Sequence, residues 1–176
     1  MRVAQLGKSG VALSRIGLGG FELGPDDDKP PDVDRARAAI AAAMASGVNW
    51  IDTSENYIST ANESLIGAAL DGVEGEFSGV QQGGTGAGLH RRCNAAHSFA
   101  VADGLRPIAD RHGATVAQVA IAWVLHQPGV SAAIAGSGNG RHIAANALAA
   151  ELDLTESLAE IDALIPLGPA FAAQGP

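Results

Sequence analysis

Apolar and polar residues follow two different periods along the chain, and these periods predict where helices and strands lie. Several segments carry apolar residues at helical spacing and are bounded by residues that favour helix termini. Short continuous apolar runs, bounded by glycine or polar residues, predict buried strands. Helices are predicted in residues 32–46, 62–72, 96–113, 115–127, 139–150 and 155–165, and strands in residues 14–20, 48–53 and 131–136.

Residues at the ends of the predicted helices refine these boundaries. Asp32 or Asp34 can cap the first helix, and Asn62 and Thr155 are predicted N-caps of later ones. Pro107 lies inside a helical segment and predicts a kink or a restart there.

The order of elements predicts an α/β fold. Residues 2–6 and 11–20 are apolar runs joined by GKSG, which predicts an N-terminal hairpin. A strand, a helix and a second strand then follow, which is a βαβ unit with parallel strands and a right-handed crossover. Residues 72–88 contain seven glycines and show no period, so no strand is predicted there. A flexible linker is the favoured reading of this stretch, and a phosphate cradle is the alternative.

Composition restricts the class of protein. The net charge of −8 disfavours nucleic acid as a partner, since binding the phosphate backbone depends on lysine and arginine clusters. The single cysteine, Cys93, allows no internal disulfide and indicates a reducing compartment. The N-terminus lacks the apolar segment of a signal peptide, and no run approaches the ~18 apolar residues of a membrane span. We therefore expect a cytoplasmic protein.

Two places carry candidate chemistry. In NWIDTSENYIST, residues 49–60, Asp52 and Tyr57 follow a buried strand. In AIAGSGNGRHIAANA, residues 133–147, a strand, a polar loop and a helix follow one another, as they do where a helix N-terminus binds a phosphate. No spacing of cysteine and histidine predicts a metal site.

Five blocks of the sequence resemble one family. They are LGKSGVALSRIGLGG, ASGVNWIDTSENY, NESLIGAAL, ATVAQVAIAWVLHQPGVSAAIAGSGN and IAANALAAELDLTE, and together they resemble the aldo-keto reductases. The resemblance implies an eight-stranded (β/α) barrel of TIM type, an NADP(H) cofactor and the reduction of aldehydes or ketones. By the same resemblance Asp52 and Tyr57 are the catalytic aspartate and tyrosine, and the tyrosine gives a proton to the carbonyl oxygen.

The resemblance has gaps at both sites. The family's lysine on strand four has no counterpart, since Lys8 and Lys29 are the only lysines and both precede Asp52; none of the five histidines matches the family's histidine on strand five. Gly138 stands where the family carries a basic residue, and Arg141 is the candidate substitute. The residues expected to contact the cofactor are Gly20, Gly136, Ser137, Asn139, Arg141, His142 and Asn146.

The length indicates where the family fold is shortened. A (β/α) barrel takes about 250 residues, and this chain has 176. The shortfall falls near residues 73–90, so the chain reads as one domain, 1–176, in which a glycine-rich join at 72–90 connects residues 1–71 to 91–176. We expect a partial barrel of about three parallel strands, equivalent to strands 8, 1 and 2, with covering helices. Its bare edges predict a homo-oligomer.

Three functions remain open at this point. The first is an NAD(P)H-dependent oxidoreductase acting on a small carbonyl substrate, impaired by its missing partners. The second is an inactive relative that binds nucleotide or serves as a scaffold. The third is a lyase or isomerase that uses Asp52 and Tyr57. Nicotinamide binding separates the first from the third, and turnover of an aldehyde separates the first from the second.

Overall fold

The structure is a computed structural model of the chain. It describes most of the chain outside the glycine-rich join and the C-terminal tail. The described residues are 1–24, 30–54, 57, 61–71, 73, 79–82 and 95–165, with the backbone alone for 79–82 and 95–98. Lys29, His90 and Cys93 lie outside this set, and so does the side chain of His97.

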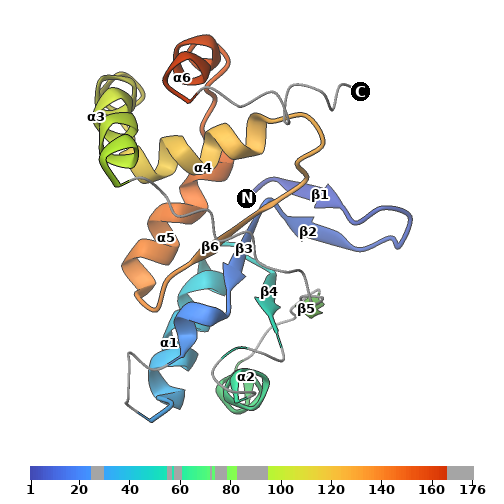
Figure 1. Cartoon of the computed structure of the whole chain (residues 1–176). Coiled ribbons are helices and arrows are strands. Elements are labelled where there is room, and N and C mark those ends of the chain that lie inside the picture. The colour runs from blue at the N-terminus through green and yellow to red at the C-terminus, as the bar shows by residue number, and fades with distance from the viewer. Residues whose placement is uncertain are drawn as a thin grey trace.

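A four-stranded parallel sheet lies at the centre of the molecule (Figure 1). Its strand order is β5-β4-β3-β6, so the three predicted strands are contiguous and the first of them is in the middle, as in a partial barrel. The antiparallel hairpin β1–β2 precedes the sheet, as predicted. The strands are β1 Val3–Gln5, β2 Ala12–Ser14, β3 Ile16–Gly19, β4 Trp50–Thr53, β5 Gly79–Gln82 and β6 Ala133–Gly136.

The fourth strand, β5, contradicts the prediction that the glycine-rich stretch holds no strand. It pairs in parallel with β4 along its whole length, from Gly79 opposite Trp50 to Gln82 opposite Thr53. Its sequence, GVQQ, contains one apolar residue and therefore carries no strand signal of its own. Pairing with an already buried neighbour decides the conformation of such a segment.

Three helices cover one face of this sheet. The parallel register places Leu18 beside Ile51, and both are fully buried in one apolar cluster with residues of the covering helices. Because side chains alternate between the two faces of a strand, Trp50 lies on the opposite face. There its ring covers Gly17, whose missing side chain leaves the space, and its indole nitrogen donates to the Ser14 carbonyl. The covering helices are α1 Val33–Ala45, α2 Asn62–Leu70 and α5 Gly140–Leu148.

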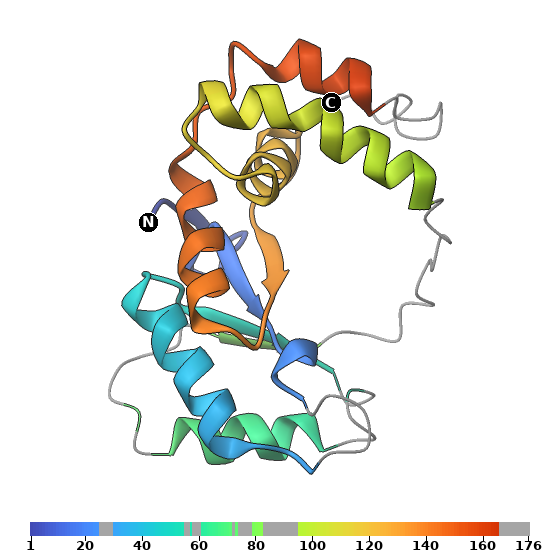
Figure 2. The same cartoon turned by 90° about the vertical axis from the view of Figure 1, so that its left-hand side faces the viewer.

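A second group of helices has a core of its own. Leu105, Ile108, Val119, Leu154 and Ile161 form its buried centre. Figures 1 and 2 show this group at the end of the molecule opposite to α2. Its helices are α3 Ala95–Arg111, α4 Val116–His126 and α6 Leu158–Leu164, and two short 3₁₀ turns are η1 Phe21–Leu23 and η3 Ala149–Glu151.

The helix ends correct three of the sequence predictions. Asp32 caps α1, as predicted, by accepting from the Arg35 amide. Asn62 is not a cap, since it lies inside α2 and its carboxamide bonds elsewhere. Thr155 donates to Asp153 while Ser157 occupies the cap position of α6. Of the predicted kink or restart at Pro107, the restart does not occur, because α3 runs unbroken from Ala95 to Arg111 with the proline inside it.

Candidate active site

The register of the sheet places the two candidate sites at the same end of the sheet, where the parallel strands have their carboxyl ends. Asp52 pairs with Gly19, and Gly19 pairs with Gly136, so the three residues form a row across the carboxyl ends of β4, β3 and β6. Neighbouring strands are about 4.8 Å apart, so Asp52 and Gly136 are separated by roughly 10 Å. Gln81 extends the row onto β5. The sequence placed these residues at strand ends, and the sheet order brings them together.

Asp52 lies on the face of the sheet that the helices leave uncovered. Its neighbour Ile51 points into the helix-covered core, so Asp52 points the opposite way. A turn after β4 brings Tyr57 back to it, with the Tyr57 amide donating to the Ser54 carbonyl at 3.0 Å. The Tyr57 hydroxyl then donates to Oδ2 of Asp52 at 3.4 Å, which is long for an O–H···O bond and therefore weak. The structure thus pairs the two predicted catalytic residues.

Phe21 is a third member of this site that sequence reasoning missed. Its ring meets the Tyr57 ring edge to face, with centroids 5.3 Å apart and planes at 78°. Such pairs contribute about 0.5–1.5 kcal/mol. Phe21 itself remains 60% exposed. The sequence around Phe21 did not indicate a contact with Tyr57, because only the folded chain brings the two rings together.

Burial and the contact between Asp52 and Tyr57 shift the pKa values of both side chains. Partial burial raises the pKa of the Asp52 carboxyl above its usual 3.8, and the bond from Tyr57 offsets part of that rise. Burial also raises the pKa of the Tyr57 phenol above 10.0, and the Asp52 charge and hydrogen bond raise it further. The pair therefore favours the neutral phenol, which makes Tyr57 a weaker acid than a free tyrosine.

The tyrosine can be titrated directly, because Tyr57 is the single tyrosine of the chain. We expect its ultraviolet absorbance titration to have a midpoint above 10.0. Asp52→Asn removes the negative charge that opposes tyrosinate formation, so the midpoint should fall in that variant. A wild-type midpoint at or below 10.0, with circular dichroism showing a folded chain, would contradict the pairing of these residues.

Asn62 holds the ends of β3 and β4 together beneath this site. Its carboxamide oxygen accepts from the Thr53 hydroxyl at 2.6 Å, and its nitrogen donates to the Gly20 carbonyl at 2.9 Å. The Gly20 amide donates to the Asp52 carbonyl at 2.8 Å. Both backbone groups of Gly20, a predicted cofactor contact, are therefore used within the protein. Asn62 was predicted as a helix cap, and only the tertiary contact reveals its role.

The loop between β6 and α5, where the sequence predicts a phosphate site, leads directly into a helix N-terminus. The Ser137 hydroxyl accepts from the Asn139 amide at 3.1 Å, and the Asn139 carboxamide caps the Arg141 amide at 2.9 Å. In the part of the chain that the structure describes, no protein group accepts from the amides of Gly140 and His142. These amides at the positive end of a helix dipole suit a phosphate.

Two residues from other elements pack against this loop. A side chain at Gly138 would begin 3.3 Å from Cζ of Arg35 on α1, and one at Gly136 would begin 2.6 Å from Cγ of Glu22 on η1. The predicted substitute cation, Arg141, is exposed and so is His142, while Asn146 is half-buried. Arg35 was missed because it is distant from this loop in sequence.

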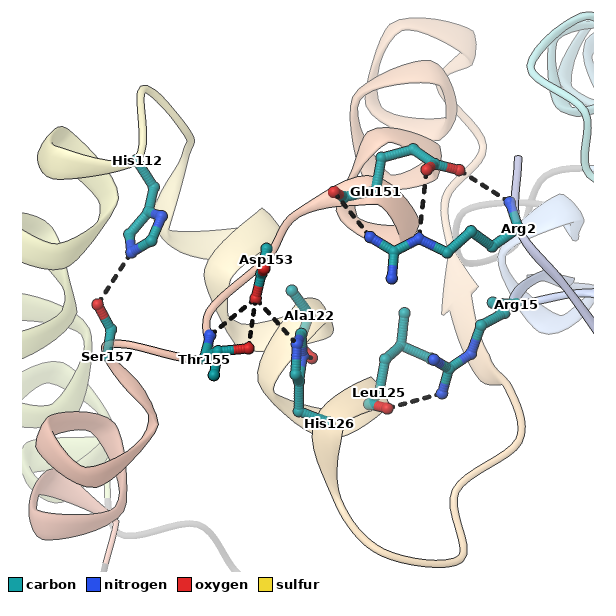
Figure 3. Close-up of polar contacts among 10 residues, drawn as sticks. All are labelled: Arg2, Arg15, His112, Ala122, Leu125, His126, Glu151, Asp153, Thr155 and Ser157. Carbon is teal, nitrogen blue, oxygen red and sulfur yellow. Dashed lines mark hydrogen bonds and ion pairs between the residues drawn. The ribbon is translucent and has the colours of Figure 1, made fainter.

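Two of the described histidines, His112 and His126, make contacts away from this site (Figure 3). His112 bonds the Ser157 hydroxyl at 2.9 Å, and His126 bonds the Ala122 carbonyl at 2.8 Å, so both belong to the second helical group. Lys8 lies in the turn of the hairpin. Among the described residues there is no cluster of three or more potential metal ligands, and no helix is long and apolar enough to cross a membrane.

Sequence comparison identifies the family. The sequence model of the Aldo/keto reductase family matches residues 15–82 and 79–166. The chain therefore belongs to the aldo/keto reductase family. The two matched segments meet at residues 79–82, inside the glycine-rich stretch, which agrees with the prediction of an internally shortened relative.

Individual relatives extend this result. An uncharacterized oxidoreductase of Bacillus subtilis strain 168, YqkF, is 33% identical over 70 residues, which cover 40% of this chain and 21% of that protein. The thermostable aldo-keto reductase Tm1743, solved with the inhibitor epalrestat, has a TM-score of 0.68 at 17% identity over 93% of this chain and 100% of that one. A Klebsiella pneumoniae aldo/keto reductase, solved with NADP and acetate, has a TM-score of 0.64 at 19% identity over 89% and 93%. These structures share the fold, which confirms the predicted partial barrel.

Proposed function

We propose that this chain binds NADP(H) at the loop between β6 and α5 and reduces an aldehyde or ketone beside Asp52 and Tyr57. The observation that supports the proposal is the row formed by Asp52, Gly19 and Gly136, which brings the two candidate sites to the same end of the sheet. Two similar Klebsiella pneumoniae structures contain NADP or NADPH.

Different residues would bind the cofactor and donate the proton. The amides of Gly140 and His142 and the Ser137 hydroxyl would hold the pyrophosphate, and bound NADPH would supply the hydride. Tyr57, supported by Phe21 and Asp52, would give its proton to the carbonyl oxygen. Its raised pKa makes that transfer slow, since a general acid works best with a pKa near the working pH. We therefore infer an impaired reductase.

Turnover tests this proposal. NADPH oxidation by the purified chain should depend on added aldehyde and saturate with it. Tyr57→Phe should lower the rate about a hundredfold, because it removes the proton donor and keeps the ring that packs on Phe21. Leu148→Ala, which changes an exposed side chain on α5, should leave the rate unchanged. A wild-type rate equal to that of Tyr57→Phe would favour the inactive relative.

We propose further that copies of the chain associate through the open edges of the sheet. The supporting feature is that β5 and β6 are the two edge strands among the residues that the structure describes, and edge strands invite pairing with another chain. Ile134 of β6 is also 52% exposed on the uncovered face. Sedimentation velocity at micromolar concentration should show a dimer or larger species, and Ile134→Lys should dissociate it, while Leu148→Lys should not. A compact wild-type monomer would contradict this proposal.

A further inference from the structure

We propose that two copies of this chain close one eight-stranded parallel barrel around a two-fold axis, and that the candidate active site stays open on one side without the partner copy. The inference deepens the proposed function and rests on it, because it names the partner that completes the same site. Its starting point is the sheet β5-β4-β3-β6, whose strands are all parallel. A closed (β/α) barrel has eight such strands, so the described sheet is half of one.

The strand directions decide which symmetric dimer closes the sheet. Two-fold dimers are the commonest assemblies of identical chains. A two-fold axis along the strands keeps all strand directions, so β6 of each copy would lie parallel to β5 of the other and both edges would be paired. A two-fold axis across the strands would instead join β6 to β6 in antiparallel orientation and leave β5 bare. Only the first arrangement gives a ring of eight parallel strands.

The outer edge of β6 is available for this pairing. The Ala133 amide donates to the Arg15 carbonyl at 2.8 Å, so the backbone polar groups of Ala133 point toward β3. Successive residues of a strand turn these groups to opposite sides, so the amide and carbonyl of Ile134 point away from β3. In the part of the chain that the structure describes, no backbone group outside the sheet bonds them. Such groups are a template for another strand.

The face of the sheet that the helices leave uncovered would become the interior of this barrel. Ile134 lies on that face and is 52% exposed. The hairpin β1–β2 lies on the same side of the sheet (Figures 1 and 2), and Val3 and Leu6 of this hairpin are 57% and 53% exposed. With Phe21, these side chains supply about half of the ~800 Å² that each partner of a stable dimer buries, and the paired strand edges add to it.

The partner copy would complete the candidate active site. Asp52 and Tyr57 lie on the uncovered face, beside the exposed ring of Phe21. In the closed barrel the partner's sheet is the opposite wall of this site. Excluding water there strengthens the hydrogen bond from Tyr57 to a carbonyl substrate. Because the axis keeps the strand directions, the sites of both copies open at the same end of the barrel.

A proline at position 134 tests the pairing of the strands. Proline is accepted where the amide of an edge strand points outward, so Ile134→Pro keeps the bonds between β6 and β3 and removes only the outward donor. By sedimentation velocity we expect its dimer Kd to rise at least tenfold. Ile134→Val keeps the donor and an apolar side chain, so its Kd should stay within threefold of wild type. Circular dichroism checks that both variants are folded.

Two further measurements test the geometry of the dimer. Amide hydrogen exchange at Ile134 should slow at least tenfold when the concentration is raised from mostly monomer to mostly dimer, and exchange at Ala133 should slow much less. Ile134→Cys in a Cys93→Ser background should form no disulfide with itself. The two β6 strands lie on opposite sides of the barrel, and a disulfide needs Cβ atoms about 3.8 Å apart.

The outcomes separate this inference from the proposed function. A wild-type monomer that oxidises NADPH with aldehyde would overturn the inference and leave the proposed function standing. Unchanged dimerisation of Ile134→Pro, unprotected Ile134 in the dimer, or rapid cross-linking of Ile134→Cys would each overturn the inference as well. If the protected dimer forms and binds no NADPH, the barrel is supported and the proposed function fails. The account expects NADPH oxidation per copy to fall on dilution with the fraction of dimer.

Discussion

Replacing Asn62 by alanine is expected to lower the free energy of unfolding by about 3–4 kcal/mol. Asn62 is fully buried and joins the Thr53 hydroxyl to the Gly20 carbonyl. The substitution leaves both of these groups without their partner, at about 1–3 kcal/mol for each buried polar group, and it leaves a small cavity beneath β4. Urea denaturation at one fixed protein concentration measures the change.

A matched control separates this effect from the general cost of losing an asparagine in a helix. Asn146 is half-buried on α5, where alanine suits the helix well. We expect Asn146→Ala to change the free energy of unfolding by less than about 0.5 kcal/mol. If Asn62→Ala changed the free energy of unfolding as little as Asn146→Ala, this result would contradict the hydrogen bonds by which Asn62 joins the ends of β3 and β4.

Replacing Gly20 by alanine is the second large effect, at about 3 kcal/mol of lost stability. A Cβ at this position would overlap the backbone carbonyl oxygen of Asp52 and would lie 3.1 Å from the Asn62 oxygen. A backbone atom cannot move aside cheaply, so the bond from the Gly20 amide to Asp52 must break. The same displacement moves Asp52 away from Tyr57. We therefore expect the tyrosine midpoint of this variant to fall toward 10.0.

Gly67 provides the control for Gly20. It lies inside α2 with open space around its Cα, so Gly67→Ala should raise stability by about 0.5–1 kcal/mol through better helix propensity. If Gly20→Ala also raised stability, this result would contradict the close contact between Gly20 and the Asp52 carbonyl. Urea denaturation of both variants, side by side, decides between the two results.

The sequence predicted those parts of the fold that carry their own local signal. The runs around Leu18, Ile51 and Ala135 are continuous and apolar, as buried parallel strands are, and each forms a strand of the sheet. Thr115 and Gln118 have the T-x-x-Q spacing of a capping box, and they form one at the start of α4. The strand β5 escaped prediction because its stability comes from the backbone of β4 rather than from its own residues.

The candidate site could be predicted only in part, because the sequence shows local signals and not tertiary contacts. Asp52 and Tyr57 were found because they follow a strand and match a family pattern. Asn62, Phe21 and Arg35 were missed or assigned another role, because their partners lie on different elements. An asparagine before an apolar run has the local signature of a cap, and nothing local distinguishes it from a buried clamp. Tertiary contacts thus determine the roles that local patterns leave undecided.

Equilibrium binding of NADPH to the wild-type chain tests the central claim most directly. The account predicts saturable binding at micromolar concentration, because the loop between β6 and α5 offers the amides of Gly140 and His142 at a helix N-terminus. Absence of binding up to millimolar NADPH would contradict it. The placement of Asp52 and Gly136 at the same end of the sheet would then be inherited from the family, and this chain would no longer use it to bind a cofactor.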